Sequence, residues 1–402
     1  MTSSPKSLEL PGKHSHVGGH DLYLISDPES RLAAVLRLID GAQRSILMFS
    51  YMFRDDESGR QVMAALMNAL RRGVSVDLIV DSFGSADTQD SFFDKIAGAG
   101  GRFNRFSSRW NMGYFIRNHQ KILIADRSSA LIGGYNITDH YFGRAGDKSW
   151  EDFGVIIIGE NVEALARYYE ELRKITADGG VRFGQLRKLI QDWKPQDSKI
   201  SWLLGGPTNR ISSWALSLKR DLERAEQLHF AAAYFSPSQS ILRRIAKVTR
   251  RGNSTLIMAG KTDNGATIPA ARSLYRYLLK RGARIFEFQT RPLHCKIIVI
   301  DDISYIGSAN LDIRSLFINM EIMVRIDDRE VAEFVRSHLT AMAQDSEEQT
   351  LIKHAKRSGL FRRIKQGLAY LLVNTLDYTI GRRIKFGLLR KPANLLTDKL
   401  NK

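Results

Sequence analysis

"HQKILIAD" (residues 119–126) and "HCKIIVID" (residues 294–301) decide the fold, because they repeat one pattern at two distant places in the chain. Each copy has a histidine, a lysine two residues later and an aspartate seven residues after the histidine, with an apolar run between lysine and aspartate. Such a run is typical of a strand that is covered on both faces. We therefore predict two equivalent strands, with the histidine and the lysine of each motif at the start of its strand.

Matching segments around the two copies indicate that the chain is a duplication. The apolar run "RSILMFSYMF" from Arg44 corresponds to "LHFAAAYFSP" from Leu228. Likewise, "RRGVSVDLIVDSF" from Arg71 corresponds to "RRGNSTLIMAGKT" from Arg250. Each half is predicted to run strand, helix, strand, helix, strand and then the histidine motif. We expect an α/β fold of two α/β/α sandwich halves, with mixed, mostly parallel sheets packed about a pseudo-twofold axis.

The composition is that of a globular protein with a strong positive charge. The chain has 402 residues, of which 43% are hydrophobic and 26% charged, enough for two domains. Its net charge of +17 predicts a phosphate-rich partner, either nucleic acid or an anionic membrane surface. The single cysteine, Cys295, excludes an internal disulfide and a cysteine-based zinc site. Neither a secretory signal nor a membrane-spanning run is expected.

Most of the positive charge lies near the C-terminus. Residues 351–402 contain thirteen Lys and Arg against two acidic residues, in segments such as "FRRIKQGL" and "GRRIKFGLL" that mix basic and apolar side chains. Such segments suit the headgroup region of an anionic bilayer. A terminal helix packed on the body is the alternative. Four basic residues are the predicted membrane contacts: Arg362, Arg363, Arg382 and Arg383.

Composition along the chain also predicts the domain boundaries. The stretch between the halves is polar and carries Pro195. The glycine-rich start, with His14, His16 and His20, is expected to be disordered rather than a metal site. The predicted segments are a disordered N-terminus (1–20), a first half (21–185), a linker (186–205), a second half (206–345) and a basic amphipathic helical tail (346–402).

An aromatic and basic loop, "SSRWNMGYFIRN", precedes the first histidine motif and contains Trp110, Tyr114 and Phe115. These three residues are candidate contacts to the substrate or to the membrane. In a lipid enzyme they could enter the acyl chains, and in a nuclease they could stack on bases. A lid that packs on the body remains a third possibility, and the sequence does not separate the three.

Side chains alternate along a strand, so His119 and Lys121 should point to the same side, and His294 and Lys296 should do so in the second copy. Each copy continues into a return strand and an asparagine, in "ALIGGYN" and "SYIGSAN", which gives the amides Asn136 and Asn310. If the halves face each other, two imidazoles, two cations and two amides surround one anion.

This set of groups suits phosphodiester cleavage through a covalent intermediate. One neutral imidazole attacks phosphorus, the opposite imidazolium protonates the leaving oxygen, and the lysines and asparagines stabilise the charge on the other oxygens. No dense group of acidic residues with metal-ligand spacing accompanies the motifs. We therefore expect neither a metal nor another cofactor.

The doubled pattern H-x-K-x4-D, followed by a glycine-rich turn and asparagine, resembles the phospholipase D superfamily over roughly residues 20–345. "LIGGYN" and "GSANLDIRSLFINMEI" are similar to the corresponding parts of bacterial cardiolipin synthases of that superfamily. The resemblance implies a phosphatidyl-histidine intermediate, with His119 as the nucleophile and His294 as the general acid and base. It also implies that Ser308 belongs to the motif, whereas Gly134 stands where many relatives have serine.

The resemblance further implies a carboxylate that orients each histidine. By this reasoning Glu321 holds the second histidine and Asp152 holds the first, although Glu151 and Asp147 compete with Asp152 for that role. The motif aspartates Asp126 and Asp301 belong to the family signature, but strand alternation suggests that they hold structure. Strand alternation likewise points the Cys295 side chain away from His294, so we predict that this thiol packs in the core and is not a nucleophile.

The sequence and the resemblance together predict a peripheral phosphatidyltransferase on the cytoplasmic side of the bacterial inner membrane. It would transfer the phosphatidyl group of one phosphatidylglycerol to a second, which gives cardiolipin and glycerol. With water as acceptor the protein would instead be a phospholipase D. A phosphodiesterase acting on nucleic acid is disfavoured because the basic excess lies in the tail. A lipid-binding scaffold without activity is the remaining alternative, disfavoured by the two complete motifs.

Overall fold

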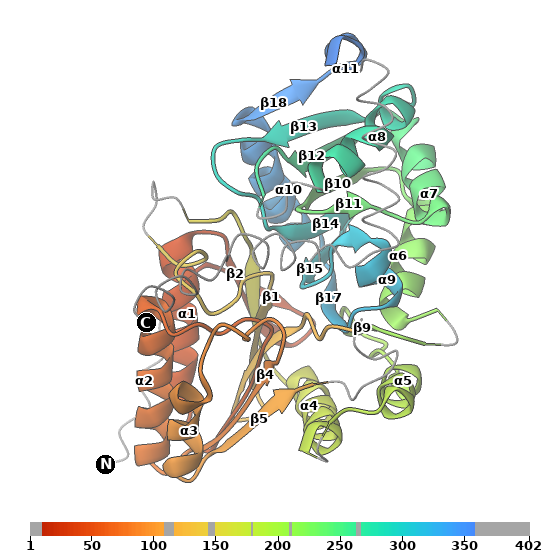
Figure 1. Ribbon diagram of the computed structural model, residues 1–402. Coiled ribbons are helices and arrows are strands. Elements are labelled where there is room, and N and C mark those ends of the chain that lie inside the picture. Colours follow the sequence, from red (N-terminus) through yellow and green to blue (C-terminus); the bar gives the residue numbers. More distant parts are fainter. Residues whose placement is uncertain are drawn as a thin grey trace, which may run out of the picture.

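The computed structural model describes residues 10–107, 116–143, 149–177, 180–208, 211–262 and 267–357. Within these ranges the chain forms two eight-stranded sheets and one short two-stranded sheet, with helices packed around them (Figure 1). No helix in these ranges is both long enough and apolar enough to cross a membrane. The predicted contacts Trp110, Tyr114, Phe115, Arg362, Arg363, Arg382 and Arg383 lie outside the described residues, as does Asp147.

The two large sheets have equivalent strand orders, as a duplication requires. The first sheet is, in spatial order, β1 (Lys13–Val17), β2 (His20–Ile25), β8 (Gly154–Ile158), β7 (Ser129–Gly133), β6 (Lys121–Ala125), β3 (Ser45–Ser50), β4 (Ser75–Asp81) and β5 (Arg102–Phe106). The second is β9 (Ile200–Gly205), β17 (Glu321–Asp327), β15 (Ile303–Gly307), β14 (Lys296–Ile300), β10 (Leu228–Ala232), β12 (Ser254–Ala259), β13 (Arg284–Phe288) and β18 (Ser346–Gln349). In these spatial orders, the seven strands from β2 through β8, β7, β6, β3 and β4 to β5 correspond one by one to the seven from β9 through β17, β15, β14, β10 and β12 to β13. Strands β1 and β18 are additional edge strands.

The prediction of two α/β halves with mixed sheets is confirmed, but the expectation of mostly parallel pairing is wrong. Parallel pairing is confined in the first sheet to β3, β4 and β5, and in the second to β10, β12 and β13. The remaining neighbours in both sheets are antiparallel. The cause is the histidine strand, because β6 and β14 run against β3 and β10 and return through tight hairpins to β7 and β15.

Helices cover both outer faces and also lie between the sheets (Figure 1). The buried core on the outer face of the first sheet includes side chains of α1 (Pro28–Gly41), α2 (Glu57–Arg71) and α3 (Asp90–Gly98). The outer face of the second sheet packs against α6 (Ser213–Arg224), α7 (Gln239–Thr249) and α8 (Thr267–Leu279). The inner core is shared by both sheets with α4 (Asn161–Ala177) and α10 (Arg329–Gln344). The remaining elements are α5 (Phe183–Asp192), α9 (Ile313–Phe317), α11 (Leu351–Arg357), β11 (Phe235–Ser236) and β16 (Leu311–Asp312).

Several of these helices begin where the sequence provides a capping side chain. The Asp27 carboxylate accepts a hydrogen bond from the Ser30 amide at the start of α1, where Pro28 also favours helix entry. Asp56 caps α2 in the same manner and Asp328 caps α10. The helices thus start at fixed positions and present their apolar faces to the sheets.

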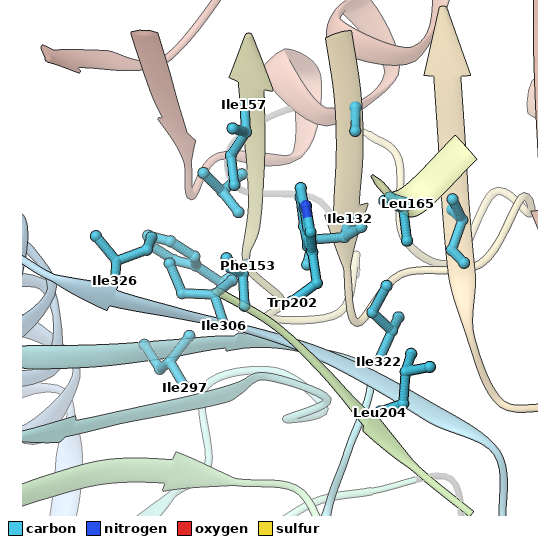
Figure 2. Close-up of a cluster of buried hydrophobic side chains, with 14 of the residues drawn as sticks. Ile132, Phe153, Ile157, Leu165, Trp202, Leu204, Ile297, Ile306, Ile322 and Ile326 are labelled. Atoms are coloured by element: carbon cyan, nitrogen blue, oxygen red, sulfur yellow. The ribbon is translucent and has the colours of Figure 1, made fainter. Parts of the chain in front are cut away.

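The inner faces of the two sheets meet in one apolar cluster that joins the halves. Ile132 on β7 and Phe153 just before β8 pack near Ile306 on β15 and Ile322 on β17, with Trp202 of β9 beside them (Figure 2). All five side chains are buried. Burial of large apolar side chains contributes about 1.5–3 kcal/mol each, so this cluster stabilises the packing of one half on the other.

Three of the predicted segments are corrected by the structure. The predicted helical tail 346–402 begins with a strand, since Ser346–Gln349 form β18, which pairs with β13. Residues Lys13–Val17 form β1, which pairs with β2, so the expectation of disorder over 1–20 is wrong for this strand. His14 and His16 are exposed on β1, and each has a ring nitrogen within hydrogen-bonding distance of Asp21. The predicted linker 186–205 contains most of α5 and all of β9, which pairs with β17 of the second sheet.

Candidate active site

The two motif histidines come from different halves and lie together where the inner ends of the sheets meet. His119 precedes β6 and His294 precedes β14, and their ring centroids are 6.5 Å apart. The His294 side chain is 5% exposed, whereas that of His119 is 13% exposed. The two histidine motifs therefore lie close together in the structure, as the sequence predicts.

Short parallel bridges between the halves hold the two histidines. Asn118 pairs with Met320, and Glu151 pairs with Leu293. As a result, the His119 amide donates to the Met320 carbonyl at 2.9 Å. The equivalent bond in the other copy joins the His294 amide to the Glu151 carbonyl at 2.8 Å.

Each histidine is oriented by a carboxylate of the opposite half, which corrects the assignment made from the resemblance. Nδ1 of His119 lies 3.4 Å from a carboxylate oxygen of Glu321, and Nδ1 of His294 lies 2.7 Å from one of Asp152. We expected the reverse pairing. Within one sheet a third strand separates the histidine strand from the carboxylate strand, and the bridges between halves instead place each carboxylate beside the other histidine.

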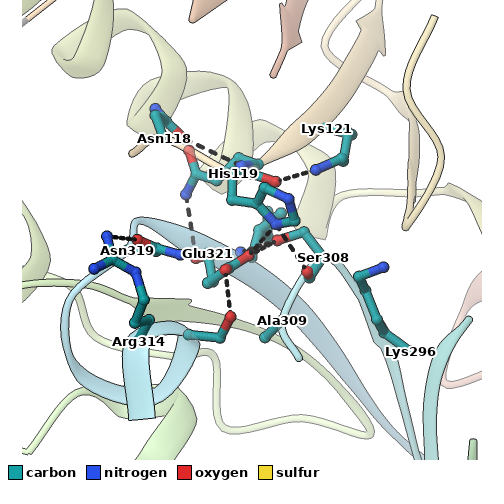
Figure 3. Close-up of polar contacts among 12 residues, drawn as sticks. Asn118, His119, Lys121, Lys296, Ser308, Ala309, Arg314, Asn319 and Glu321 are labelled. Carbon is teal, nitrogen blue, oxygen red and sulfur yellow. Dashed lines mark hydrogen bonds and ion pairs between the residues drawn. The ribbon is translucent and has the colours of Figure 1, made fainter. Parts of the chain in front are cut away.

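Glu321 is fully buried and is held by hydroxyl groups from its own half (Figure 3). The Ser308 hydroxyl donates to one carboxylate oxygen, and the Ser315 hydroxyl donates to the other at 2.8 Å. Ser308 also accepts from the Ile322 amide at 3.0 Å. From the other half, the Gln120 side-chain amide donates to the Glu321 carbonyl at 3.2 Å. The two serine hydroxyls restrict the carboxylate that faces His119, and the other two bonds hold Ser308 and the Glu321 backbone.

Asp152 is fully buried, and its carboxylate is bonded by a histidine and a backbone amide rather than by hydroxyl groups. One of its oxygens bonds Nδ1 of His294, and the other accepts from the Phe153 amide at 2.8 Å. Burial raises the pKa of Asp152 to about 6. Gly134, the position equivalent to Ser308, leaves the space that this carboxylate occupies, because a Cβ there would lie 2.2 Å from an Asp152 oxygen.

Replacing Gly134 with serine should therefore be harmful, although serine stands at the equivalent position of the second copy. The new side chain would displace Asp152 from His294, and we expect a destabilisation of about 1–3 kcal/mol together with lost activity. Thermal denaturation measures the first effect. Gly98→Ser is the matched control, because a Cβ at Gly98 meets nothing within 4 Å. Equal melting temperatures for the two variants would contradict the expectation.

A buried arginine organises the chain around Asp152. Arg31, on α1, is fully buried and donates from its guanidinium to the Asp152 carbonyl at 2.6 Å. It also donates to the carbonyls of Tyr141, Trp150 and Ser26. A buried cation bonded to four carbonyls fixes the segments that surround His294. Sequence reasoning missed Arg31, since a single arginine on an amphipathic helix gives no signal of burial.

The two lysines flank the histidines. Lys121 Nζ donates to the His119 carbonyl at 2.6 Å (Figure 3). Lys296 Nζ lies 2.8 Å from Nδ1 of His294. Burial lowers the pKa of Lys121 to about 7, so a bound anion would favour its charged form. Burial, followed by the charge of Lys121, lowers the pKa of His119 below its usual value. His119 is therefore neutral near pH 7, the form that a nucleophilic imidazole requires.

The two motif asparagines differ in their contacts. Asn136 accepts from the Met52 amide at 3.3 Å through Oδ1 and donates through Nδ2 to the Tyr141 hydroxyl at 3.0 Å. Asn310 is buried, and its Oδ1 has no hydrogen-bond partner among the described residues. An amide in this position could contact a ligand in the site.

The motif aspartates lie at the far ends of the histidine strands and make structural contacts. Asp126 accepts from three backbone amides, Gln43, Arg44 and Ser45. Asp301 accepts from the amides of Glu226 and Gln227. Both aspartates have a positive φ in their hairpins, 53° and 50°. These contacts agree with the interpretation that the aspartates hold structure.

Two other residues from the sequence analysis lie outside the catalytic contacts. Cys295 is fully buried in the inner apolar core, and burial raises the pKa of its thiol. Glu151 bonds the guanidinium of Arg291 and lies 3.5 Å from the ring of His338, rather than contacting His119. Among the described residues, no group of three or more His, Cys, Asp or Glu side chains is arranged to hold a metal ion.

The chain is similar to known proteins both in sequence and in fold. Residues 35–175 and 218–343 match the model of the family described as cardiolipin synthase, phospholipase D-like domain. Cardiolipin synthase B of Escherichia coli K12 is 30% identical over 334 residues, which cover 81% of this chain and 80% of that protein. Cardiolipin synthase A of Pseudomonas syringae is 28% identical, over 85% of this chain and 71% of that protein. In fold, the chain resembles phosphatidylserine synthase of Haemophilus influenzae, with a TM-score of 0.70, 14% identity, and coverage of 95% and 97%.

Proposed function

Because the chain belongs to the cardiolipin synthase family of phospholipase D-like proteins, we propose that it condenses two phosphatidylglycerol molecules into cardiolipin and glycerol. The observation that carries the proposal is the pair of histidines, 6.5 Å apart at their ring centroids, each beside a buried carboxylate. Two acid-base groups on opposite sides of one phosphodiester can attack and protonate in a single displacement.

In the first step His119 attacks phosphorus. The bond from nitrogen to phosphorus forms as the bond to the glycerol oxygen breaks, and the leaving oxygen takes a proton from His294. Glu321 stabilises the positive charge that develops on the His119 ring, since its carboxylate lies 3.4 Å from Nδ1. The charged lysines stabilise the oxygens of the transferred phosphoryl group.

The second step reverses the first with a new alcohol. His294, now neutral, removes a proton from a hydroxyl of the second phosphatidylglycerol, and that oxygen displaces His119 from phosphorus. The histidines thereby return to their starting protonation states. One site thus serves both half-reactions, which accounts for a duplicated motif.

The proposed location is the cytoplasmic face of the bacterial inner membrane, with the protein bound peripherally. Support comes from the charge distribution, since residues 351–402 carry thirteen basic and two acidic residues. Each basic residue near an anionic surface contributes about 1 kcal/mol to binding.

Product analysis by mass spectrometry tests the proposed function. The purified protein and its His119→Ala variant are each incubated with phosphatidylglycerol vesicles. Cardiolipin and glycerol that depend on His119 would support the transferase. Phosphatidic acid without cardiolipin would instead make the protein a phospholipase D, and absence of any lipid product would overturn the proposal.

The pH dependence of the reaction should show a loss of activity below about pH 6. Protonation of Asp152, whose pKa burial raises to about 6, removes the acceptor for Nδ1 of His294 and so weakens its imidazolium form. The limb is measured as kcat/KM for phosphatidylglycerol. The control is a phosphatidyl ester of p-nitrophenol, whose leaving group needs no proton and whose profile should stay flatter. The same limb for both esters would assign it to another group, such as His119.

A further inference from the structure

A tyrosine hydroxyl lies at the atom of His294 that must exchange a proton with the substrate. Tyr141 Oη is 3.3 Å from Nε2 of His294, while Nδ1 of the same ring faces Asp152 at 2.7 Å. Tyr141 is buried, and its ring lies edge-on to the imidazole with 5.0 Å between centroids. Tyr141 is not part of either histidine motif, and its distance in sequence from the histidines gave no indication of a role.

The hydrogen bonds around Tyr141 indicate which way its proton points. The Met52 amide donates to Oδ1 of Asn136, and this fixes Nδ2 of Asn136 toward Tyr141, 3.0 Å away. Tyr141 therefore accepts one bond from Asn136 and can direct its own proton at Nε2 of His294. Nδ1 of His294 lies within hydrogen-bonding distance of both the Asp152 carboxylate, at 2.7 Å, and Lys296 Nζ, at 2.8 Å. A neutral ring with its proton on Nδ1 donates to Asp152 and leaves Nε2 as an acceptor, whereas the imidazolium form donates from Nε2 to Tyr141.

The second copy lacks this arrangement. Tyr141 follows Asn136 by five residues, and the residue at the same distance from Asn310 is Ser315. The Ser315 hydroxyl instead donates to the Glu321 carboxylate at 2.8 Å. His119 does have a tyrosine ring beside it, that of Tyr51 with 4.7 Å between centroids, but Tyr51 precedes the motif and is not the counterpart of Tyr141. The residue at the position of Tyr141 thus differs between the copies, and Tyr141 contacts the histidine to which proton transfer is assigned.

Building on the proposed function, we infer that Tyr141 is a further catalytic residue, which relays the proton between His294 and the oxygen that leaves or attacks phosphorus. In the first step the leaving oxygen takes the tyrosine proton as Tyr141 takes the Nε2 proton of His294. The net transfer is one proton from His294 to the leaving group. In the second step the acceptor hydroxyl gives its proton to Tyr141, which passes its own to His294.

Tyr141→Phe tests the inference with two phosphatidyl esters. On phosphatidylglycerol, whose alkoxide must be protonated, we expect kcat to fall by about 10²-fold, in the range of general acid-base contributions. On the p-nitrophenyl ester, which leaves as a stable phenolate, the first step should fall by no more than about threefold. A burst of p-nitrophenol measures that step and also shows that the variant is folded.

Tyr135→Phe is the matched control. Tyr135 lies six residues earlier and is buried, and its hydroxyl has no hydrogen-bond partner among the described residues. This variant should turn over both esters as the unsubstituted protein does.

Three outcomes would overturn the inference. Equal losses on both esters would make Tyr141 a positioning residue, and no loss on phosphatidylglycerol would remove it from catalysis. If the unsubstituted protein turned over neither ester, the proposed function would fail and this inference with it. If it released p-nitrophenol and hydrolysed phosphatidylglycerol without forming cardiolipin, only the acceptor would change, and the comparison of esters would still decide the role of Tyr141.

Discussion

Replacing His119 with alanine should lower phosphatidyl transfer by at least about 10⁴-fold, the scale seen when a nucleophile is removed from an enzyme that forms a covalent intermediate. The loss should be the same for phosphatidylglycerol and for the p-nitrophenyl ester, because no leaving group compensates for a missing nucleophile. Turnover is measured by mass spectrometry and by p-nitrophenol release.

His294→Ala provides the contrast to that variant. It should release p-nitrophenol in a single burst and then retain the phosphatidyl group, since no base remains to activate the acceptor hydroxyl. A labelled lipid bound covalently to this variant, and sensitive to acid as a phosphoramidate is, would identify the intermediate. If His119→Ala gave the burst and His294→Ala did not, the roles of the two histidines would be exchanged.

The second prediction with a large expected effect concerns the two carboxylates, each of which faces the histidine of the other half. Asp152 faces His294 at 2.7 Å and Glu321 faces His119 at 3.4 Å, so each amide variant should impair the step of the histidine in the other half. We expect both Asp152→Asn and Glu321→Gln to reduce transfer from phosphatidylglycerol by about 10²- to 10⁴-fold, as removal of a triad carboxylate does.

The p-nitrophenyl ester separates the two variants. Asp152→Asn should keep most of its burst, because in the first step His294 only protonates the leaving group, and p-nitrophenolate leaves without a proton. Glu321→Gln should lose the burst, because attack by His119 depends on its carboxylate. Ser337→Ala is a suitable control, since Ser337 bonds only within α10 among the described residues. The opposite pattern would support orientation of each histidine by the carboxylate of its own half.

The repeat is sufficient to predict the duplicated α/β halves, and it predicts the convergence of His119 with His294 once the halves are taken to face each other. It could not predict which carboxylate faces which histidine. That pairing depends on the bridges of Asn118 with Met320 and of Glu151 with Leu293, which are contacts between halves. Spacing within one half contains no information about them.

Other errors and omissions have local physical causes. Parallel pairing was overestimated because an apolar run such as 122–125 predicts burial on both faces without predicting strand direction. Tyr141 was missed because an aromatic residue after a turn is usually core. Alignment of the two copies would have given a signal, since the position equivalent to Tyr141 is serine. The burial of Arg31 depends on four carbonyls from separate segments and leaves no trace in its own helix.

The pairing of each histidine with a carboxylate of the other half also determines when activity appears during folding. The contacts between histidine and carboxylate join residues far apart in the chain, since His294 and Asp152 differ by 142 in residue number. Each half has its own outer apolar core and can gain secondary structure before the halves dock. Neither histidine has its carboxylate until docking is complete. Recovery of turnover during refolding would thus report the last assembly step, later than the recovery of helix and sheet.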